Sequence, residues 1–188
     1  MKSVGKAQRI FDKHGITPVY VVDYPVATEP EGYKPLQDIF NDNRCLIGAH
    51  LHPWVNPPYH EQVNSYNSFA GNLPYELESE KLNVLTETLT QTFGERPVIY
   101  KAGRYGVGPN TTRILEGQQF EIDLSICPRM NYSDTQGPDF VELSCHPYFF
   151  GKDKKLLEIP MTIEYTGLLS SLGNTIHSFT TKKSVRPF

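Results

Sequence analysis

The stretch that decides the fold and the site is Ile47-Gly48-Ala49-His50-Leu51-His52-Pro53-Trp54. An apolar strand gives way to a loop here, and two histidines stand two positions apart at the junction. Side chains at alternate positions of an extended segment point to the same side, so both imidazoles can face one ion. Two neutral imidazoles and a carboxylate are suitable ligands for zinc or a similar divalent ion. The competing interpretation is two partly buried histidines that bond to loop carbonyls.

Helix and strand signals alternate on both sides of this stretch. The apolar patterns predict strands at residues 18–23, 44–49, 97–102, 120–126, 140–144 and 156–162. They predict helices at residues 3–13, 35–41, 76–93, 109–115 and 168–172. The first strand has four β-formers in a row and is expected to be buried, and a proline-rich loop is expected at residues 25–30. The irregular region 53–74 is expected to be a substrate-side loop.

This alternation predicts a mainly parallel α/β sheet in one domain, residues 1–188. Ligand sites of such sheets form at the carboxyl ends of the strands. Asp23, His50, Lys101 to Arg104 and Asp123 to Ser125 fall at or near such ends. Polar groups from four strands are therefore expected to converge on one rim.

Composition excludes several classes of protein. A formal charge of −3 with scattered basic residues argues against nucleic acid as a partner. No apolar run approaches the roughly 18 residues of a membrane span. Three widely spaced cysteines, Cys45, Cys127 and Cys145, fit neither a disulfide framework nor a zinc ribbon, and indicate reduced thiols and a cytoplasmic location.

The candidate site residues each have an ordinary alternative. Asp23 can be a ligand, a base or the cap of the next turn. Arg104 can stabilise an oxyanion or lie on the surface beside a helix cap. Trp54, Tyr24 and Tyr105 can form apolar platforms for a sugar or simply pack. His14, His60 and His177 are assigned to the surface or to packing, and no Gly-x-Ser-x-Gly elbow of a serine hydrolase occurs.

Five runs resemble the polysaccharide deacetylase superfamily, and more narrowly its WalW-like branch. They are YVVDYPVA at residues 20–27, IGAHLHPW at 47–54, YKAGRYG at 100–106, GPDF at 137–140 and LEIPMT at 157–162. The resemblance implies a distorted (β/α) barrel that removes an N- or O-acetyl group from a sugar through a divalent metal. It covers residues 10–162.

Carried over by motif, His50 corresponds to the first histidine of the family's His-x-x-x-His pattern. Trp54 stands where the second histidine is expected, so His52 is the substitute that the chemistry suggests. Lys101 occupies the place of the arginine that opens the family's third motif, and Arg104 follows three residues later. The resemblance further implies that the family's first strand, with its acidic pair, precedes this chain, and only His177 faintly matches the last motif.

These observations lead to one working hypothesis. The chain is expected to be a metal-dependent carbohydrate deacetylase-like protein on an incomplete barrel, with His50, His52 and Asp23 as metal ligands. Asp23 and Arg104 are the expected catalytic residues, and Trp54, Tyr24, Tyr105 and Lys101 the expected substrate-binding residues. The alternative is an inactive homologue that binds saccharide or a partner chain. Open sheet edges in an incomplete barrel also favour a homo-oligomer.

Overall fold

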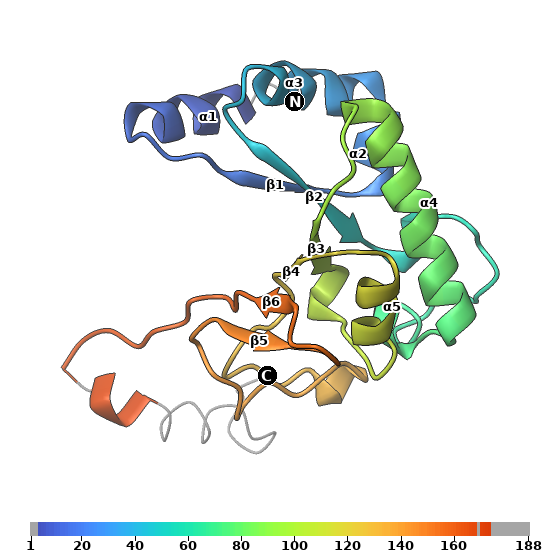
Figure 1. The fold of residues 1–188 in the computed structure, drawn as a ribbon. Coiled ribbons are helices and arrows are strands. Elements are labelled where there is room, and N and C mark those ends of the chain that lie inside the picture. The colour runs from blue at the N-terminus through green and yellow to red at the C-terminus, as the bar shows by residue number, and fades with distance from the viewer. Residues whose placement is uncertain (1–3, 169, 174–188) are drawn as a thin grey trace.

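The computed structural model describes residues 4–168 and 170–173, which form an open, six-stranded sheet. The strands are β1 (Val19–Val22), β2 (Leu46–Leu51), β3 (Ile99–Ala102), β4 (Ile122–Asp123), β5 (Tyr148–Phe150) and β6 (Leu156–Glu158). Their order is β1-β2-β3-β4-β6-β5, and every pair is parallel except β5 with β6. The sheet curves without closing, because β1 and β5 are its two edges (Figure 1). The predicted mainly parallel, incomplete α/β barrel is confirmed.

Helices cover the outer side of this sheet and leave the inner side open (Figure 1). They are α1 (Val4–Lys13), α2 (Tyr24–Thr28), α3 (Pro30–Asn41), α4 (Tyr75–Phe93) and α5 (Thr111–Gly117). Short 3-10 turns lie at Pro53–Val55, Ala70–Asn72, Gly103–Tyr105, Ser133–Thr135 and Ser170–Leu172. None of the helices in the described ranges is both long and apolar enough to cross a membrane.

Helix α4 anchors the main core, as its sequence period predicts. Leu82, Leu85 and Leu89 recur at helical spacing and are fully buried against the sheet and α2. The helix ends at Gly94, whose left-handed conformation (φ 80°) lets its N–H close the last turn on Thr90. The core therefore lies between the sheet and its helices.

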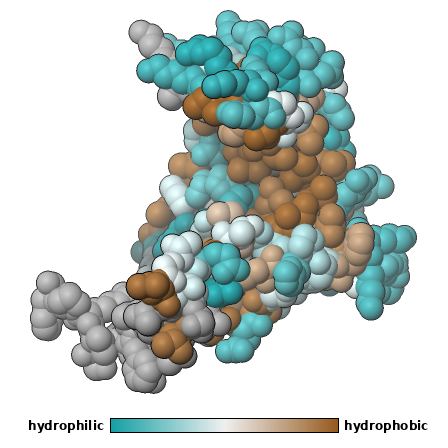
Figure 2. Space-filling view, turned by 90° about the vertical axis from the view of Figure 1, so that its left-hand side faces the viewer, coloured by the Kyte–Doolittle hydropathy of each residue, from teal (hydrophilic) through white to brown (hydrophobic). Residues whose placement is uncertain are grey.

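Strand β2 separates this core from the open side. Ile47, Ala49 and Leu51 point into the core, and the alternation of side chains puts Leu46 and His50 on the opposite face. Figure 2 shows apolar surface spread over the open side. Leu46 is 49% exposed there.

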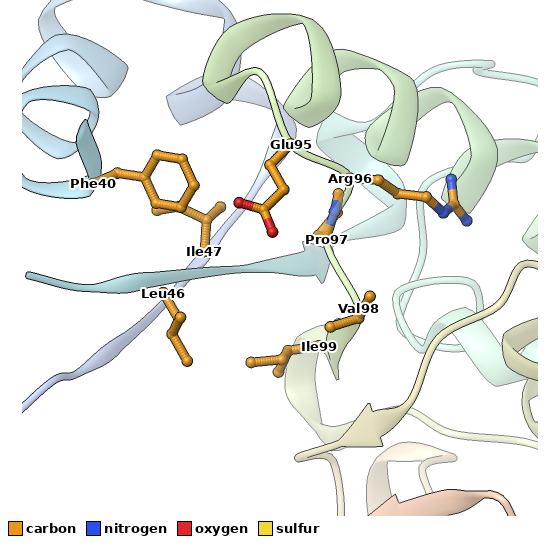
Figure 3. Close-up of a pocket in the computed structure, with 8 residues that line it drawn as sticks. All are labelled: Phe40, Leu46, Ile47, Glu95, Arg96, Pro97, Val98 and Ile99. Carbon is orange, nitrogen blue, oxygen red and sulfur yellow. The ribbon is translucent and has the colours of Figure 1, made fainter. Parts of the chain in front are cut away.

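A shallow pocket lies at the amino ends of β2 and β3 (Figure 3). It is lined by Phe40, Leu46, Ile47, Glu95, Arg96, Pro97, Val98 and Ile99. Sites of parallel sheets form at the carboxyl ends of the strands, which is the opposite end of β2, where the histidines are. This pocket is therefore separate from the predicted site.

The expected proline-rich loop at residues 25–30 is wrong, because α2 and the start of α3 occupy it. Pro25 and Pro30 stand in the first turns of these helices, where proline's missing N–H costs no hydrogen bond. Asp23 caps α2 by accepting from Val26 N at 3.2 Å. Helix α3 starts five residues earlier than expected and continues through Pro35.

Three other sequence expectations are corrected. Strand β1 is an edge strand whose only buried residue is Val22, so its apolar run does not mean burial on both faces. Residues 140–144 form turns and not a strand, because Phe140 pairs back with Met130 in a local hairpin and leaves no free partner strand. The helix expected at 168–172 is a single 3-10 turn at Ser170–Leu172.

Candidate active site

His50 is held at the carboxyl end of β2 by the neighbouring strand. It pairs with Lys101 of β3, and its Nδ1 lies 3.0 Å from the Lys101 carbonyl oxygen. A carbonyl can only accept, so Nδ1 carries the hydrogen and Nε2 presents a lone pair. Burial lowers the pKa of His50, while the bond to Lys101 opposes this shift. The ring is thus oriented with Nε2 as its available acceptor.

His52 follows on the same side, as the sequence predicts. Its ring meets the His50 ring edge to face at 4.4 Å and lies 4.6 Å from the ring of Trp54. Burial, followed by the nearby His50, lowers the pKa of His52 to about 4. Its Nδ1 is buried with no hydrogen-bond partner among the described residues. His52 is therefore neutral at pH 7 and carries an unsatisfied ring nitrogen.

Gly103 provides the room for the His52 ring. A Cβ atom at position 103 would lie 2.3 Å from His52 Nδ1 and 2.6 Å from the Leu51 carbonyl oxygen. Both distances are far below van der Waals contact, so no other residue fits here without moving the imidazole. Gly103, in the turn after β3, thus leaves the space that the ring of His52, in the turn after β2, occupies.

Asp23 stands at the end of β1 and combines two of the roles considered for it. Its Oδ1 caps α2 through Val26 N. Its negative charge also acts on His50 and His52, raising the pKa of each against the larger effect of burial. The cap is therefore the observed structural role, and Asp23 is the carboxylate whose charge acts on both imidazoles.

Two of the three side chains expected to bind a divalent metal present a suitable donor atom. His50 resembles a typical metal ligand, because its second ring nitrogen donates to a backbone carbonyl. The orphaned Nδ1 of His52 is a second buried donor atom. Within the described ranges no three His, Cys, Asp or Glu side chains gather closely enough to hold an ion. Asp23 thus does not complete a ready-made cage.

Lys101 and Tyr105 meet beside His50, and a tyrosine that sequence reasoning missed joins them. Lys101 Nζ donates to the Leu124 carbonyl at 2.7 Å and lies 4.6 Å from the centre of the Tyr105 ring. Tyr105 stacks on Tyr132 at 5.7 Å, with the two rings 15° from parallel. Tyr132 comes from the polar loop after residue 128, where a lone aromatic gives no periodic signal.

Two of the expected residues turn elsewhere. Arg104 lies over the Phe69 ring at 4.1 Å and bonds to the Ser68 hydroxyl, although its charge still lowers the pKa of His52 slightly. It adopts a left-handed conformation (φ 56°) that is unusual for a side chain of its size. Tyr24 packs against the main core. Both therefore contact neighbouring protein groups and not the histidine pair.

Of the three other histidines assigned to the surface or to packing, two can be placed. His14 and His60 are exposed, and His177 lies outside the described residues. Cys45, Cys127 and Cys145 are free thiols.

A cluster of three buried polar side chains lies at the ends of β4 and β6, and the sequence predicted two of them. Asp123 and Ser125 were expected at the rim, and both are buried there. Glu158 joins them from β6, where it is 1% exposed and lies opposite Asp123. The available signal was a single glutamate between apolar residues of a strand, which is also the pattern of an ordinary half-exposed strand.

The irregular region after the histidines is fixed to α4 by Lys81. This residue is fully buried, and its Nζ donates to the carbonyls of Pro53 (3.0 Å), Asn56 (2.7 Å) and Pro58 (2.6 Å). Glu61 Oε1 lies 2.9 Å from the same ammonium. The hydrogen bonds and the ion pair of Lys81 thus fix the first part of the region 53–74 to α4.

Comparison with known proteins shows which fold this is. No protein-family model matches the chain, and no curated protein matches it. Several solved structures do match it. A Mycobacterium smegmatis protein assigned as a polysaccharide deacetylase has a TM-score of 0.61 and 20% identity, over 88% of this chain and 50% of that one. PuuE allantoinase has a TM-score of 0.51 and 21% identity, over 86% of this chain and 44% of that one.

The third structure is IcaB from Ammonifex degensii, with a TM-score of 0.47 and 19% identity, over 63% of this chain and 52% of that one. The chain thus spans about half the length of the structures it matches. It shares its fold, a mainly parallel and incomplete α/β barrel, with the M. smegmatis structure and with PuuE allantoinase. The likeness does not single out the WalW-like branch.

Proposed function

We propose that the chain is a deacetylase-like hydrolase that removes an acetyl group from an N- or O-acetylated sugar or polysaccharide. The observation that carries the proposal is the neutral pair His50 and His52 at the carboxyl end of β2, on a fold shared with a deacetylase. His50 has Nε2 as its available acceptor, and His52 has a buried nitrogen without a partner among the described residues.

In this proposal His50 and His52 would hold a divalent metal, most simply zinc, through their imidazoles. A bound zinc ion supplies a water molecule that ionises near neutral pH. Asp23 is the nearest carboxylate whose charge acts on both rings, and it completes the ligand set or serves as base after leaving its cap. Arg104 stabilises developing charge, which requires it to leave the Phe69 ring.

The sugar would lie over the aromatic and cationic groups beside the histidines. The ring of Trp54 lies against that of His52, and Lys101, which pairs with His50, lies over the ring of Tyr105. Tyr24 is the weakest of the expected contacts, because its ring packs on the core. The segment after Trp54, held by Lys81, would cover the ligand.

Zinc titration by calorimetry tests the metal site directly. We expect one zinc ion per chain, lost in His50→Ala and in His52→Ala. His60→Ala is the matched control, because His60 is exposed. If the wild-type chain takes up no zinc, cobalt or nickel, the metal-dependent reading is wrong.

Acetate release separates the enzyme from its alternative, an inactive homologue that binds saccharide. The zinc-loaded chain is expected to release acetate from an N-acetylglucosamine oligomer or an acetylated xylan, with His50→Ala inactive. Saccharide binding without acetate release by a chain that holds zinc would favour the inactive homologue.

Self-association is also proposed, with a second copy of this chain as the partner. Strand β1 is an edge of the sheet, and Val19 and Leu46 beside it are 37% and 49% exposed. An unpaired strand edge next to apolar surface is suited to pairing with another chain. We expect sedimentation velocity to give a dimer that Leu46→Glu dissociates, and a wild-type monomer at 100 µM or so would exclude it.

A further inference from the structure

One peptide unit, that between Lys101 and Ala102, joins two hydrogen bonds that point the same way. Its carbonyl accepts from His50 Nδ1 at 3.0 Å, and its N–H donates to Ser125 Oγ at 2.8 Å. Because both groups belong to one conjugated amide, each bond polarises the other. His50 is therefore coupled to a serine two strands away.

The series of hydrogen bonds continues from Ser125 to Asp123. Its hydroxyl donates to Asp123 Oδ1, and its backbone N–H donates to the same oxygen at 3.0 Å. Ser125 is completely buried, so water does not compete for these bonds. All donors run in one direction, from His50 to Asp123, which is the arrangement that reinforces itself.

Asp123 is the last acceptor in this series of hydrogen bonds, and it lies next to a second buried carboxyl group. It lies opposite Glu158 in the parallel pairing of β4 with β6, and both side chains are buried. Two carboxyl groups that share a buried site resist being ionised together, so the pair holds a proton. Glu158 Oε1 accepts from Ile126 N at 3.0 Å, which leaves its other oxygen to carry the proton.

The surroundings of the pair favour Glu158 as the protonated member. Burial, and then the charge of Asp123, raise the pKa of Glu158. Burial also raises the pKa of Asp123, but its two bonds from Ser125 oppose this shift. The other titratable groups that face the pair are Lys101 and Tyr100 of β3 and Tyr148 of β5. Lys101 favours a single negative charge on the pair.

We propose that Ser125, Asp123 and Glu158 are positioning residues for His50. The series of hydrogen bonds that ends at these residues strengthens the bond from His50 Nδ1 to the Lys101 carbonyl. It thereby keeps the hydrogen of His50 on Nδ1 and the Nε2 lone pair turned toward the site. The inference deepens the proposed function and depends on it only for the zinc readout described below.

Substitution Ser125→Ala removes the link and leaves both carboxyl groups in place. Nitrogen-15 chemical shifts of the imidazoles are expected to show His50 protonated on Nδ1 in the wild type. In Ser125→Ala the share of the Nε2-protonated tautomer should rise, although the Lys101 carbonyl still accepts from Nδ1 and keeps the Nδ1-protonated form the major one. Ser133→Ala is the control, because Ser133 is exposed in the next loop. An unchanged His50 tautomer in a folded Ser125→Ala chain would overturn the inference.

Zinc affinity provides the second readout. Loss of a group that orients a metal ligand typically weakens binding by about 10–100-fold, and we expect the lower end for Ser125→Ala because the Lys101 carbonyl remains. If the wild-type chain binds no zinc while the tautomer still changes in Ser125→Ala, the proposed function fails and the positioning role stands. Unchanged affinity in a zinc-binding chain would count against the role.

Substitution Glu158→Gln tests the proton, and it serves if Ser125→Ala does not fold. The amide mimics a neutral acid and still donates to Asp123, so the His50 tautomer and the urea midpoint at pH 7 should match or exceed the wild type. Because the folded-state pKa of Glu158 lies above its unfolded value of about 4.5, wild-type stability should fall as pH rises above that value. Glu158→Gln should lack this part of the slope. A Glu158→Gln midpoint clearly below wild type at pH 7 would mean that Glu158 is ionised in the fold.

Discussion

The two faces of the central strand β2 carry different properties of the molecule. Leu51 points toward the helices and is completely buried with α4, whereas Leu46, on the other face, is 49% exposed. His50 shares the open face with Leu46. The covered face therefore supplies stability, and the open face supplies the chemistry. The following experiments test how sharply the two can be separated.

The largest effect is expected on the covered side, at Lys81. Lys81→Met leaves Glu61 and three carbonyl groups without their buried cation, and breaking a buried ion pair from one side costs about 3–5 kcal/mol. The urea-derived free energy of unfolding measures this loss. Lys34→Met, at an exposed lysine of α3, is the control. A loss below about 1 kcal/mol, the median for surface pairs, would show that water enters this site.

A matched pair of leucines compares the two faces directly. Leu85→Ala on the covered face should cost about 2–5 kcal/mol, because it leaves a cavity in the packed core. Leu46→Ala on the open face should change stability by no more than about 0.5 kcal/mol. Urea unfolding at concentrations at which the chain is monomeric gives both values. Similar losses for the two variants would mean that the open face is covered in solution.

Gly103→Ala should disturb the site together with the end of β2, because the added methyl group would also lie 2.6 Å from the Leu51 carbonyl oxygen. The added methyl group would meet His52 Nδ1 at 2.3 Å, so the ring must rotate away from its position against Trp54. We expect zinc affinity to fall by at least about 10-fold, as for loss of an orienting contact. The matched control is Gly117→Ala, because a Cβ atom there meets nothing within 4 Å. Wild-type affinity in Gly103→Ala would exclude His52 as a ligand.

The last test concerns a protonation step at low pH. The pKa of His52 is lowered to about 4, so the folded chain resists protonation there while the unfolded chain takes up the proton near 6.5. This contribution to stability is fully present above pH 6.5 and is lost as pH falls toward 4. Trp54 is the single tryptophan, and its fluorescence should change with a midpoint near pH 4 as the neighbouring imidazole becomes charged. A midpoint near 6.5 would show that His52 is open to water.

Sequence reasoning found the elements whose signals are local and periodic. The α4 leucines recur at helical spacing, and the His50 and His52 spacing follows directly from strand geometry. It failed where a partner far along the chain decides the structure. The apolar run of β1 looks buried, yet the strand lies at an edge, and Phe140 pairs locally with Met130.

The candidate site shows the same division. The rings of His50, His52 and Trp54 come together as their spacing suggests, whereas Arg104 is drawn to Phe69, a residue 35 positions earlier. Glu158 could not be assigned, because its meaning depends on lying opposite Asp123 in the sheet. Roles of single residues in the reaction stay predictions until they are measured.

The alternation along β2 also sets which kinds of sequence change the protein can tolerate. A substitution at Leu46 acts on the open face alone, and the covered face keeps its contacts. Deletion of one residue would instead shift every following side chain to the opposite face. It would turn His50 toward the leucines of α4 and expose Leu51, so the core and the histidine pair would be lost together. In this strand the alternation of side chains between the two faces therefore matters more for the fold and the site than any single side chain.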